Sequence, residues 1–347
     1  MMADLMPVDF INTQTLFKLI EIAVILGLLI PIAAMLVWVE RRMIGIWQDR
    51  HGPNRVGPGG ILQSLADLLK ILGKDEFTPK FADRFTFIAA PIIAAVTVLM
   101  SFAVIPFSDT IGVSNLNIGV LFFLAMTSLA VYGVVLAGWA SKNKYALLGS
   151  MRAAAQTISY EVFMGLSLMG VVLLTGSFNL RDIVLAQQDG WFISTQIIGF
   201  IVFLIAGIAE SHRLPFDLPE AETELTAGFH TEYSGLKFAL FFLGEYLGVT
   251  LISAMSVTLF FGGYLAPSFL PANIANMIPA LVWFIGKVFI LIMFFILLRT
   301  SLPRPRFDQL LAFGWKVMLP LALFNLLLTA VLRLTGVISG AGDINHG

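Results

Sequence analysis

Long apolar stretches alternate with polar connections along the chain. Eight of them are long enough to span a bilayer, which takes about 20 apolar residues. They lie near 16–39, 85–105, 119–140, 157–176, 191–210, 238–263, 279–298 and 316–335. The pattern predicts an all-α, polytopic membrane protein whose residues 1–347 form a single integral membrane domain. The fourth stretch is the weakest, because Thr157, Ser159 and Glu161 interrupt it.

The first long connection contains a shorter helical pattern. Residues 61–74 place their leucines and isoleucines at helical spacing, with Gln63, Asp67 and Lys70 opposite. At about 14 residues the helix is too short to span. We therefore expect an amphipathic helix that lies along the membrane surface or roofs a cavity, or one that only anchors the loop. The preceding residues 45–60 are rich in glycine and proline, which predicts a turning, non-helical backbone.

The composition agrees with a membrane protein and excludes several chemistries. Apolar residues make up 58% of the chain and charged residues only 12%, against roughly 25% charged in soluble domains. Cysteine is absent, so no disulfide, iron–sulfur cluster or thiolate metal site can come from this chain. No dinucleotide-binding, P-loop or zinc-protease motif is present, and the four histidines lack metal-ligand spacing. We expect no redox centre, no bound metal and no nucleic-acid partner.

Basic residues predict the orientation. The connections near 40–84, 141–156, 211–237 and 299–315, with Lys316 at the edge of the last, hold 17 of the 21 lysines and arginines. Because positive charge favours the cytoplasmic side, these loops are expected to face the cytoplasm or the mitochondrial matrix. Both termini are then expected on the outer side of the membrane.

The connection after the fifth stretch is strongly acidic. From Glu210 to Glu232 it holds one arginine, Arg213, and six carboxylates, for a net charge of about −5. The six are Glu210, Asp217, Glu220, Glu222, Glu224 and Glu232. Closely packed like charges raise one another's pKa values, so we interpret this segment as one that exchanges protons. An ordinary solvated surface is the alternative.

Ionisable residues also fall within the apolar stretches. Glu161, Glu245 and Lys287 would each cost roughly 2.5–3.5 kcal/mol at a helix centre, so each needs a partner or a function. Pairing between helices, or reaching toward the membrane surface, is the structural alternative. For Lys287, near mid-span, we expect a buried carboxylate partner or a water-filled path.

Three loops closely resemble a known family. The segments ERRMIGIWQDRHGPNRVGPGGILQSLADLLK (40–70), RLPFDLPEAETELTAGFHTEY (213–233) and LRTSLPRPRFDQL (298–310) are similar to those of the H-type membrane subunit of respiratory complex I, the proton-pumping NADH:quinone oxidoreductase. That subunit lies where the membrane and peripheral arms meet. The resemblance extends over nearly the whole chain, including the number and order of the spans.

The resemblance implies a chamber for quinone, a substrate with a hydrophobic tail. Peripheral-arm subunits would carry the terminal iron–sulfur cluster and the headgroup site, FMN would be bound in the same arm, and other membrane-arm subunits and lipids would complete the surroundings. The quinone-binding candidates are Glu40, Arg41, Arg50, Leu62, Leu65, Leu69, Phe229 and Arg299. Arg41, Arg50 and Arg299 could instead hold the peripheral arm through ion pairs.

The resemblance also implies that acidic residues couple quinone reduction to proton movement. The proton-coupling candidates, with Lys287 added from its place in the seventh span, are Glu161, Glu210, Asp217, Glu220, Glu222, Glu224, Glu232, Glu245 and Lys287. The expected location is a bacterial cytoplasmic membrane or a mitochondrial inner membrane. The alternatives are a related subunit of a membrane-bound hydrogenase-type complex, a stand-alone proton-coupled transporter, and a structural anchor for a soluble complex.

Overall fold

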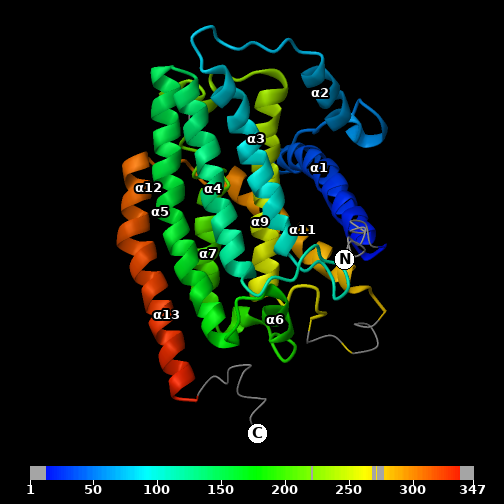
Figure 1. Ribbon diagram of the computed structural model, residues 1–347, viewed down its shortest axis with the longest axis vertical. Helices are drawn as coiled ribbons and strands as arrows, with labels where there is room; N and C mark the ends of the chain where they lie inside the picture. The colour runs from blue at the N-terminus through cyan, green and yellow to red at the C-terminus, as the bar shows by residue number, and fades with distance from the viewer. Residues whose placement is uncertain (1–12, 220–221, 268–270, 272–276, 337–347) are drawn as a thin grey trace, which may run out of the picture.

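The computed structural model describes residues 13–219, 222–267, 271 and 277–336. Within this part of the chain the regular structure is helical, and seven helices are long and apolar enough to cross a membrane. They form an elongated bundle, and the long connection from α1 to α3, which includes α2, extends beside one end of it (Figure 1). The prediction of an all-α, polytopic membrane protein is confirmed.

The membrane-length helices follow the apolar stretches in order. They are α1 (Thr13–Trp47), α3 (Arg84–Ser101, continued by the 3-10 turn Phe102–Val104), α4 (Gly119–Ala140), α5 (Lys144–Thr175), α9 (Gly235–Phe260), α11 (Ala280–Ser301), and α12 (Phe307–Phe313) joined through the π-helical turn Gly314–Met318 to α13 (Leu319–Leu334). Short elements connect them: α2 (Gln63–Leu72), α6 (Leu180–Leu185), α7 (Ile197–Glu210), α8 (Glu222–Leu225), and the 3-10 turns Pro58–Gly60, Phe192–Ser194 and Gly228–His230.

Several helices differ in length from the predicted stretches. α5 begins at Lys144 rather than near 157, because the Asn143 side chain caps it by accepting a hydrogen bond from the Tyr145 amide at 3.0 Å. Residues 141–156, predicted as a loop, are therefore mostly helical. α1 likewise continues past Arg41 to Trp47, and α12 makes part of the last predicted loop helical.

The fifth predicted span is the shortest helix of the series. α7 has 14 residues and is therefore about 21 Å long, less than the roughly 30 Å of a bilayer core. Its first turn is held by the buried Gln196, which donates to Thr329 at 2.7 Å and accepts from Asn325 at 2.9 Å, both on α13. The segment before it forms a 3-10 turn instead of extending the helix.

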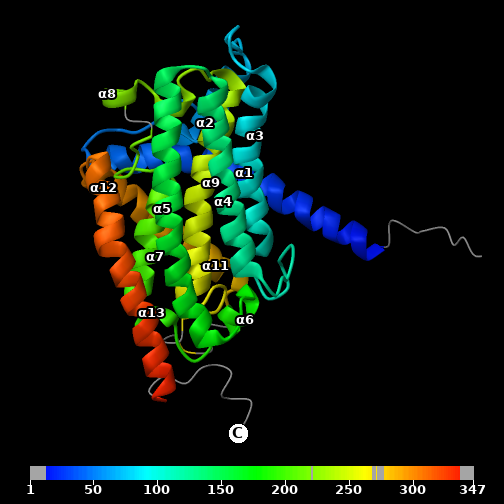
Figure 2. The ribbon, with the colours of Figure 1, turned by 60° about the vertical axis from the view of Figure 1, so that its left-hand side comes forward.

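Helix α9 is the centre of the bundle, whereas α1 lies largely outside it. Every residue from 249 to 260 on α9 is buried. Small residues allow its neighbours to approach closely: a Cβ on Gly207 of α7 would lie 2.3 Å from the Ile252 side chain of α9. α1 leaves the bundle at a steep angle toward its amino end (Figure 2). The apolar surface of α1 is therefore available to lipid or to partner helices.

Candidate functional site

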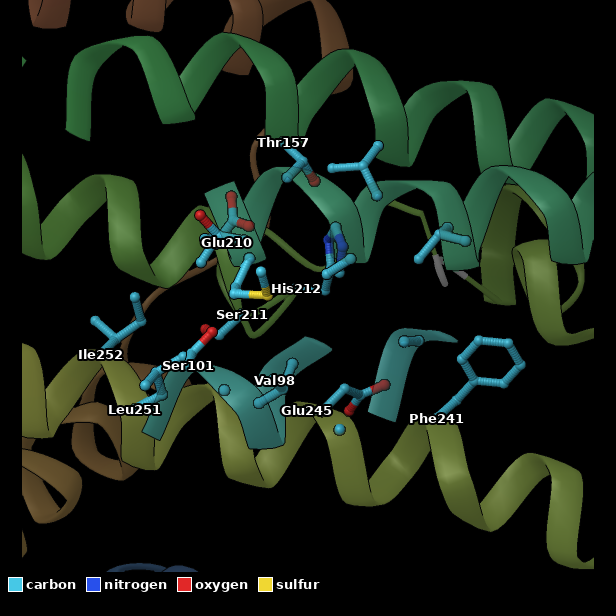
Figure 3. A pocket seen from close by; sticks show the side chains of 18 of the residues that line it. Val98, Ser101, Thr157, Glu210, Ser211, His212, Phe241, Glu245, Leu251 and Ile252 are labelled. Carbon is cyan, nitrogen blue, oxygen red and sulfur yellow. The ribbon is translucent and has the colours of Figure 1, made fainter. Parts of the chain in front are cut away.

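A cavity lies between five helices and extends from the acidic connection toward the middle of the bundle. Its volume is about 90 Å³, and α3, α4, α5, α7 and α9 all contribute to its walls. Figure 3 shows Glu210 and Glu245 on opposite sides of it, at the end of α7 and on α9, with His212 close by. Most of the lining is apolar, including Val98, Leu251 and Ile252. We call this space the carboxylate cavity.

Two glutamates, Glu161 and Glu210, interact electrostatically on the α5–α7 side of this region. Glu210 is the last residue of α7, and its buried Oε2 atom has no hydrogen-bond partner among the described residues. Glu161 of α5 accepts a hydrogen bond from the Ser128 hydroxyl of α4. The two carboxylates are close enough to repel each other.

His212 follows directly after α7 and turns the chain into the cavity. Its backbone lies in the left-handed region, with φ at 49°, which is uncommon for a residue with a side chain. The Nδ1 atom is buried without a hydrogen-bond partner among the described residues. Burial lowers the pKa of His212 to about 4, although the nearby Glu245 carboxylate favours the protonated form. The imidazole is therefore neutral at physiological pH.

The carboxylate of Glu245 pairs with Arg213 at 3.2 Å, and both side chains are largely buried. The Arg213 guanidinium also stacks on Tyr246, 4.0 Å from the ring centroid, and lies 5.8 Å from the ring centroid of Phe242. A buried charge pair of this kind keeps its position only while both partners are charged, because loss of one leaves the other uncompensated.

A second, smaller cavity of about 20 Å³ lies on the other side of this pair. Arg213 lines it together with Glu40 of α1, Tyr246 of α9 and Arg299 of α11. Glu40 and Arg299 form an ion pair, and Glu40 also interacts with the Tyr246 hydroxyl. Since Glu245 lines the carboxylate cavity and Arg213 lines this one, the Arg213–Glu245 pair is the boundary between the two spaces.

Asp217 extends the network toward the connection between α11 and α12. It pairs with Arg304 at 2.9 Å, while its Oδ1 atom is buried without a hydrogen-bond partner among the described residues. Burial raises the pKa of Asp217 to about 6, despite the opposing effect of Arg304, and repulsion from Glu245 acts in the same direction as burial. Asp217 therefore titrates closer to neutral pH than an exposed aspartate does.

Gln156 is a member of this site that the sequence analysis did not identify. This α5 residue is fully buried, and its amide donates to the carbonyls of Ala209 and Phe216, both at 2.8 Å. It thereby holds the backbone on both sides of His212. Its Oε1 atom has no partner in the described part of the chain. A glutamine inside an apolar helix was the signal that could have indicated it.

The remaining acids of the connection attach it to neighbouring elements. Glu224 pairs with Arg152 at 2.5 Å, and Glu232 accepts a hydrogen bond from Asn143 at 2.7 Å. Both contacts lie at the surface of the bundle rather than in the carboxylate cavity. Glu220 lies outside the described residues, as does the side chain of Glu222.

The predicted quinone-binding residues form one main group and two outliers. Arg41 pairs with Asp67 at 2.7 Å and so links α1 to α2. Leu62, directly before α2, and Leu65 and Leu69 within it are 48%, 53% and 62% exposed. The main group therefore consists of Arg41, these three leucines and the Glu40–Arg299 pair, and it lies around α1, α9 and α11.

The two outliers lie elsewhere. Arg50 is exposed and donates to the nearby Gln48 at 2.9 Å. Phe229 lies in the wall of the carboxylate cavity, packed against Phe241 with ring centroids 5.2 Å apart.

Lys287 is far from the acids, at the opposite end of α9. Its ammonium donates to three backbone carbonyls just beyond that helix, those of Phe261 at 2.7 Å, Gly263 at 3.0 Å and Leu265 at 2.7 Å. It also lies 4.7 Å from the ring centroid of Trp191. Of the two expected alternatives, the carboxylate partner is wrong for the described part of the chain: backbone carbonyls satisfy the charge, as they do for cations at helix C-termini.

The fold and the site together define a polytopic helical membrane protein with a buried network of acids and arginines at one end. A family model described as NADH dehydrogenase matches residues 20–330. Over 316 residues the chain is 60% identical to the H-type subunit of NADH-quinone oxidoreductase from Methylococcus capsulatus, an alignment that covers 90% of this chain and 98% of that protein. The chain belongs to the NADH dehydrogenase family. Its resemblance to the H-type membrane subunit is thereby confirmed.

Proposed function

We propose that this chain is the subunit of NADH:quinone oxidoreductase that forms the membrane-side wall of the quinone chamber and couples quinone reduction to proton translocation. The supporting observation is the Arg213–Glu245 pair between two cavities, one lined by Glu40 and Arg299 and the other by Glu210 and His212. The iron–sulfur clusters, FMN and the quinone headgroup site belong to peripheral-arm subunits in this proposal, and further membrane-arm subunits flank the chain.

The chamber part of the proposal rests on apolar surface next to buried charge. α2 exposes its leucines while Arg41 and Asp67 hold it to α1. A quinone tail needs such an apolar corridor, and about 25 cal/mol for each Å² of buried apolar area retains it. The Glu40–Arg299 pair and Tyr246 then present polar groups at the inner end of the corridor.

The coupling part rests on the electrostatic effect of the reduced quinone on nearby acidic side chains. Reduction adds electrons, and therefore negative charge, to the quinone before protons arrive. At a distance of about 10 Å and an effective dielectric constant of about 20, one unit charge changes a proton-binding energy by about 1.7 kcal/mol, which is roughly one pKa unit. Asp217, with its pKa raised to about 6, is poised to take up a proton after such a change. Glu245 interacts with both Asp217 and His212 and so extends the effect into the carboxylate cavity.

We also propose an orientation for the chain in the membrane. The acidic connection, the α1–α3 connection and residues 299–306 would face the cytoplasm or matrix, where the peripheral arm docks. Both termini would face the opposite side of the inner membrane.

Replacing Glu245 with Gln tests the coupling part. Gln keeps the size of the side chain but cannot hold or release a proton, so NADH-driven quinone reduction by the assembled complex should fall at least about tenfold, equivalent to about 1.4 kcal/mol. NADH oxidation by a soluble artificial acceptor should stay unchanged. Glu224→Gln, which alters an acid at the surface, is the control and should retain most activity. Normal quinone reduction in Glu245→Gln would refute the proposal.

A photoreactive quinone analogue tests the chamber part separately. It should label residues 40–70 or 213–240 in the assembled complex, with labelling suppressed by excess quinone. Labelling confined to other subunits would contradict the chamber assignment and leave the coupling result unaffected.

A further inference from the structure

A third cavity, of about 170 Å³, lies at the end of the bundle opposite the acidic connection. Its walls come from the beginning of α1, from residues 104–116 between α3 and α4, and from residues 179–181 at the beginning of α6. Because α1, α3, α4 and α5 all have an end here, the cavity lies at the level where lipid headgroups meet a helical bundle. We call it the end cavity.

Two cations line the end cavity, Lys18 of α1 and Arg181 of α6. Among the described residues, neither has a carboxylate within the 4.0 Å that defines an ion pair. The one acid in the wall, Glu21, accepts a hydrogen bond from the Gly112 amide at 3.0 Å and keeps its negative charge. The charged side chains of the wall therefore sum to +1, from two cations and one anion.

Neutral polar groups complete the wall. Thr110 and Asn115 both line the cavity. The Asn179 side-chain oxygen accepts a hydrogen bond from the Arg181 amide at 2.9 Å, so its NH₂ group is the polar end that remains. Hydroxyl and amide donors beside two cations form a suitable environment for a phosphate group, whose oxygens each accept hydrogen bonds.

The surface next to this cavity is apolar and exposed. Ile20, Val24 and Leu28 of α1 are 51%, 53% and 57% exposed, and their spacing of four residues places them on one face of the helix. α1 stands away from the bundle along this part of its length (Figure 2). Acyl chains can therefore lie along α1 while a headgroup attached to them reaches Lys18.

We propose that the end cavity binds the phosphate group of an anionic phospholipid. The lipid phosphate contacts Lys18 and Arg181, and the acyl chains cover the exposed face of α1. Free inorganic phosphate shares the same recognition chemistry, but it lacks the chains that would use this apolar face. The inference is independent of the quinone chamber and of the carboxylate cavity.

The test counts the phospholipids that stay bound to the assembled complex. The complex is purified in detergent with phosphatidylcholine and phosphatidylglycerol supplied in equal amounts, and native mass spectrometry compares wild type with the double variant Lys18→Gln, Arg181→Gln. Each cation near a membrane surface is worth about 1 kcal/mol toward an anionic lipid. We therefore expect phosphatidylglycerol to bind roughly thirtyfold more weakly, which is about 2 kcal/mol at 1.4 kcal/mol per factor of ten. Arg333→Gln alters a cation at the same end outside the cavity and should keep the lipid.

A second arm separates the two sources of phosphate. Inorganic phosphate is added to the wild-type complex at increasing concentration. If phosphatidylglycerol stays bound in wild type and is lost only in the double variant, the lipid assignment holds. If millimolar inorganic phosphate releases all of the phosphatidylglycerol, the acyl chains add nothing to its retention, and the part of the proposal that assigns them to the exposed face of α1 is overturned. Equal lipid retention in wild type and the double variant overturns the whole proposal, whatever the variant does to quinone reduction.

Discussion

The two ends of helix α9 both bury polar groups, but they differ in which groups lack a hydrogen-bond partner among the described residues. Near the carboxyl end these are the neutral Tyr264 hydroxyl and Trp283 indole, whereas at the other end they include carboxylates and an imidazole. At the carboxyl end, the Lys287 ammonium meets three carbonyls. Beside it the buried Gln187 donates to Ile183 and Thr258 and accepts from Gly262 and Phe192. Such a saturated set holds the chain in one arrangement and has no free position for a proton.

Around the amino-terminal half of α9, the corresponding groups are incomplete. Glu210 Oε2, Asp217 Oδ1, Gln156 Oε1 and His212 Nδ1 are all buried without hydrogen-bond partners among the described residues. Unpaired buried acceptors cost free energy, roughly 1–3 kcal/mol each, unless water or a proton serves them. This difference supports the proposal that proton exchange takes place at the end with the acidic connection rather than around Lys287.

Lys287→Met should have the largest effect, and that effect should be on stability. It removes the donor from three partly buried carbonyls, so we expect the free energy of unfolding to fall by roughly 3–5 kcal/mol. Quinone reduction per folded complex should be unchanged. Thermal unfolding in detergent measures the stability, and a turnover assay on the intact complex measures quinone reduction. Lys316→Met, at an exposed lysine, should change stability by less than about 0.5 kcal/mol. A stable Lys287→Met complex with lost proton pumping would instead place Lys287 in the proton path.

The pH dependence of stability should reveal two opposing groups at the acidic end. The folded state binds the Asp217 proton more tightly than the unfolded chain does, so this group lowers stability as pH rises from about 4 to about 6. His212, whose pKa falls from 6.5 to about 4, binds its proton less tightly when folded. It therefore raises stability as pH rises over nearly the same window. Each contribution is on the order of 3 kcal/mol, because one pKa unit is about 1.4 kcal/mol.

Single variants separate these two contributions. Asp217→Asn should leave a stability that increases between pH 4 and pH 6, and His212→Gln should leave one that decreases, whereas wild type is comparatively flat. Chemical denaturation at several pH values measures the slopes. The same slope in both variants would show that these side chains do not titrate as their burial implies.

Gln156→Leu should have a smaller effect that is confined to the acidic connection. The change removes two hydrogen bonds to the carbonyls of Ala209 and Phe216, so we expect a loss of about 2 kcal/mol. Hydrogen exchange should become faster in residues 211–219 and remain unchanged near Lys287. Gln188→Leu, at an exposed glutamine, is the matched control. Unchanged exchange in residues 211–219 would mean that Gln156 does not hold this backbone.

Arg41→Ala should have the smallest effect. The Arg41–Asp67 pair is partly exposed, with 48% and 28% of the two side chains accessible, so its contribution is about 0.2–1 kcal/mol and should fall with added salt. A double-mutant cycle with Asp67→Ala measures the coupling energy. A coupling above about 2 kcal/mol would indicate that this contact is buried by another subunit in the assembled complex.

Local pattern was sufficient to predict most of the fold. Lipid solvates no backbone polar groups, so long apolar stretches must form helices, and α3, α4, α9 and α11 appear close to their predicted positions. The amphipathic pattern of residues 61–74 likewise became α2 with its leucines exposed. Helix ends were less predictable, because a cap such as Asn143 or a long-range contact such as Gln196–Asn325 decides where a helix begins.

The sequence by itself therefore determined the class of protein, the family and the residues that carry unusual charge. Only the tertiary structure decided which of those charges meet. Glu40 and Arg299 are 259 positions apart, and nothing in their local pattern identifies them as partners. The same holds for Lys287, whose partners are carbonyls, and for Gln156, which holds a segment about 50 residues away. Helix periodicity is a property of neighbours in sequence, whereas pairing depends on how distant helices rotate and tilt against one another.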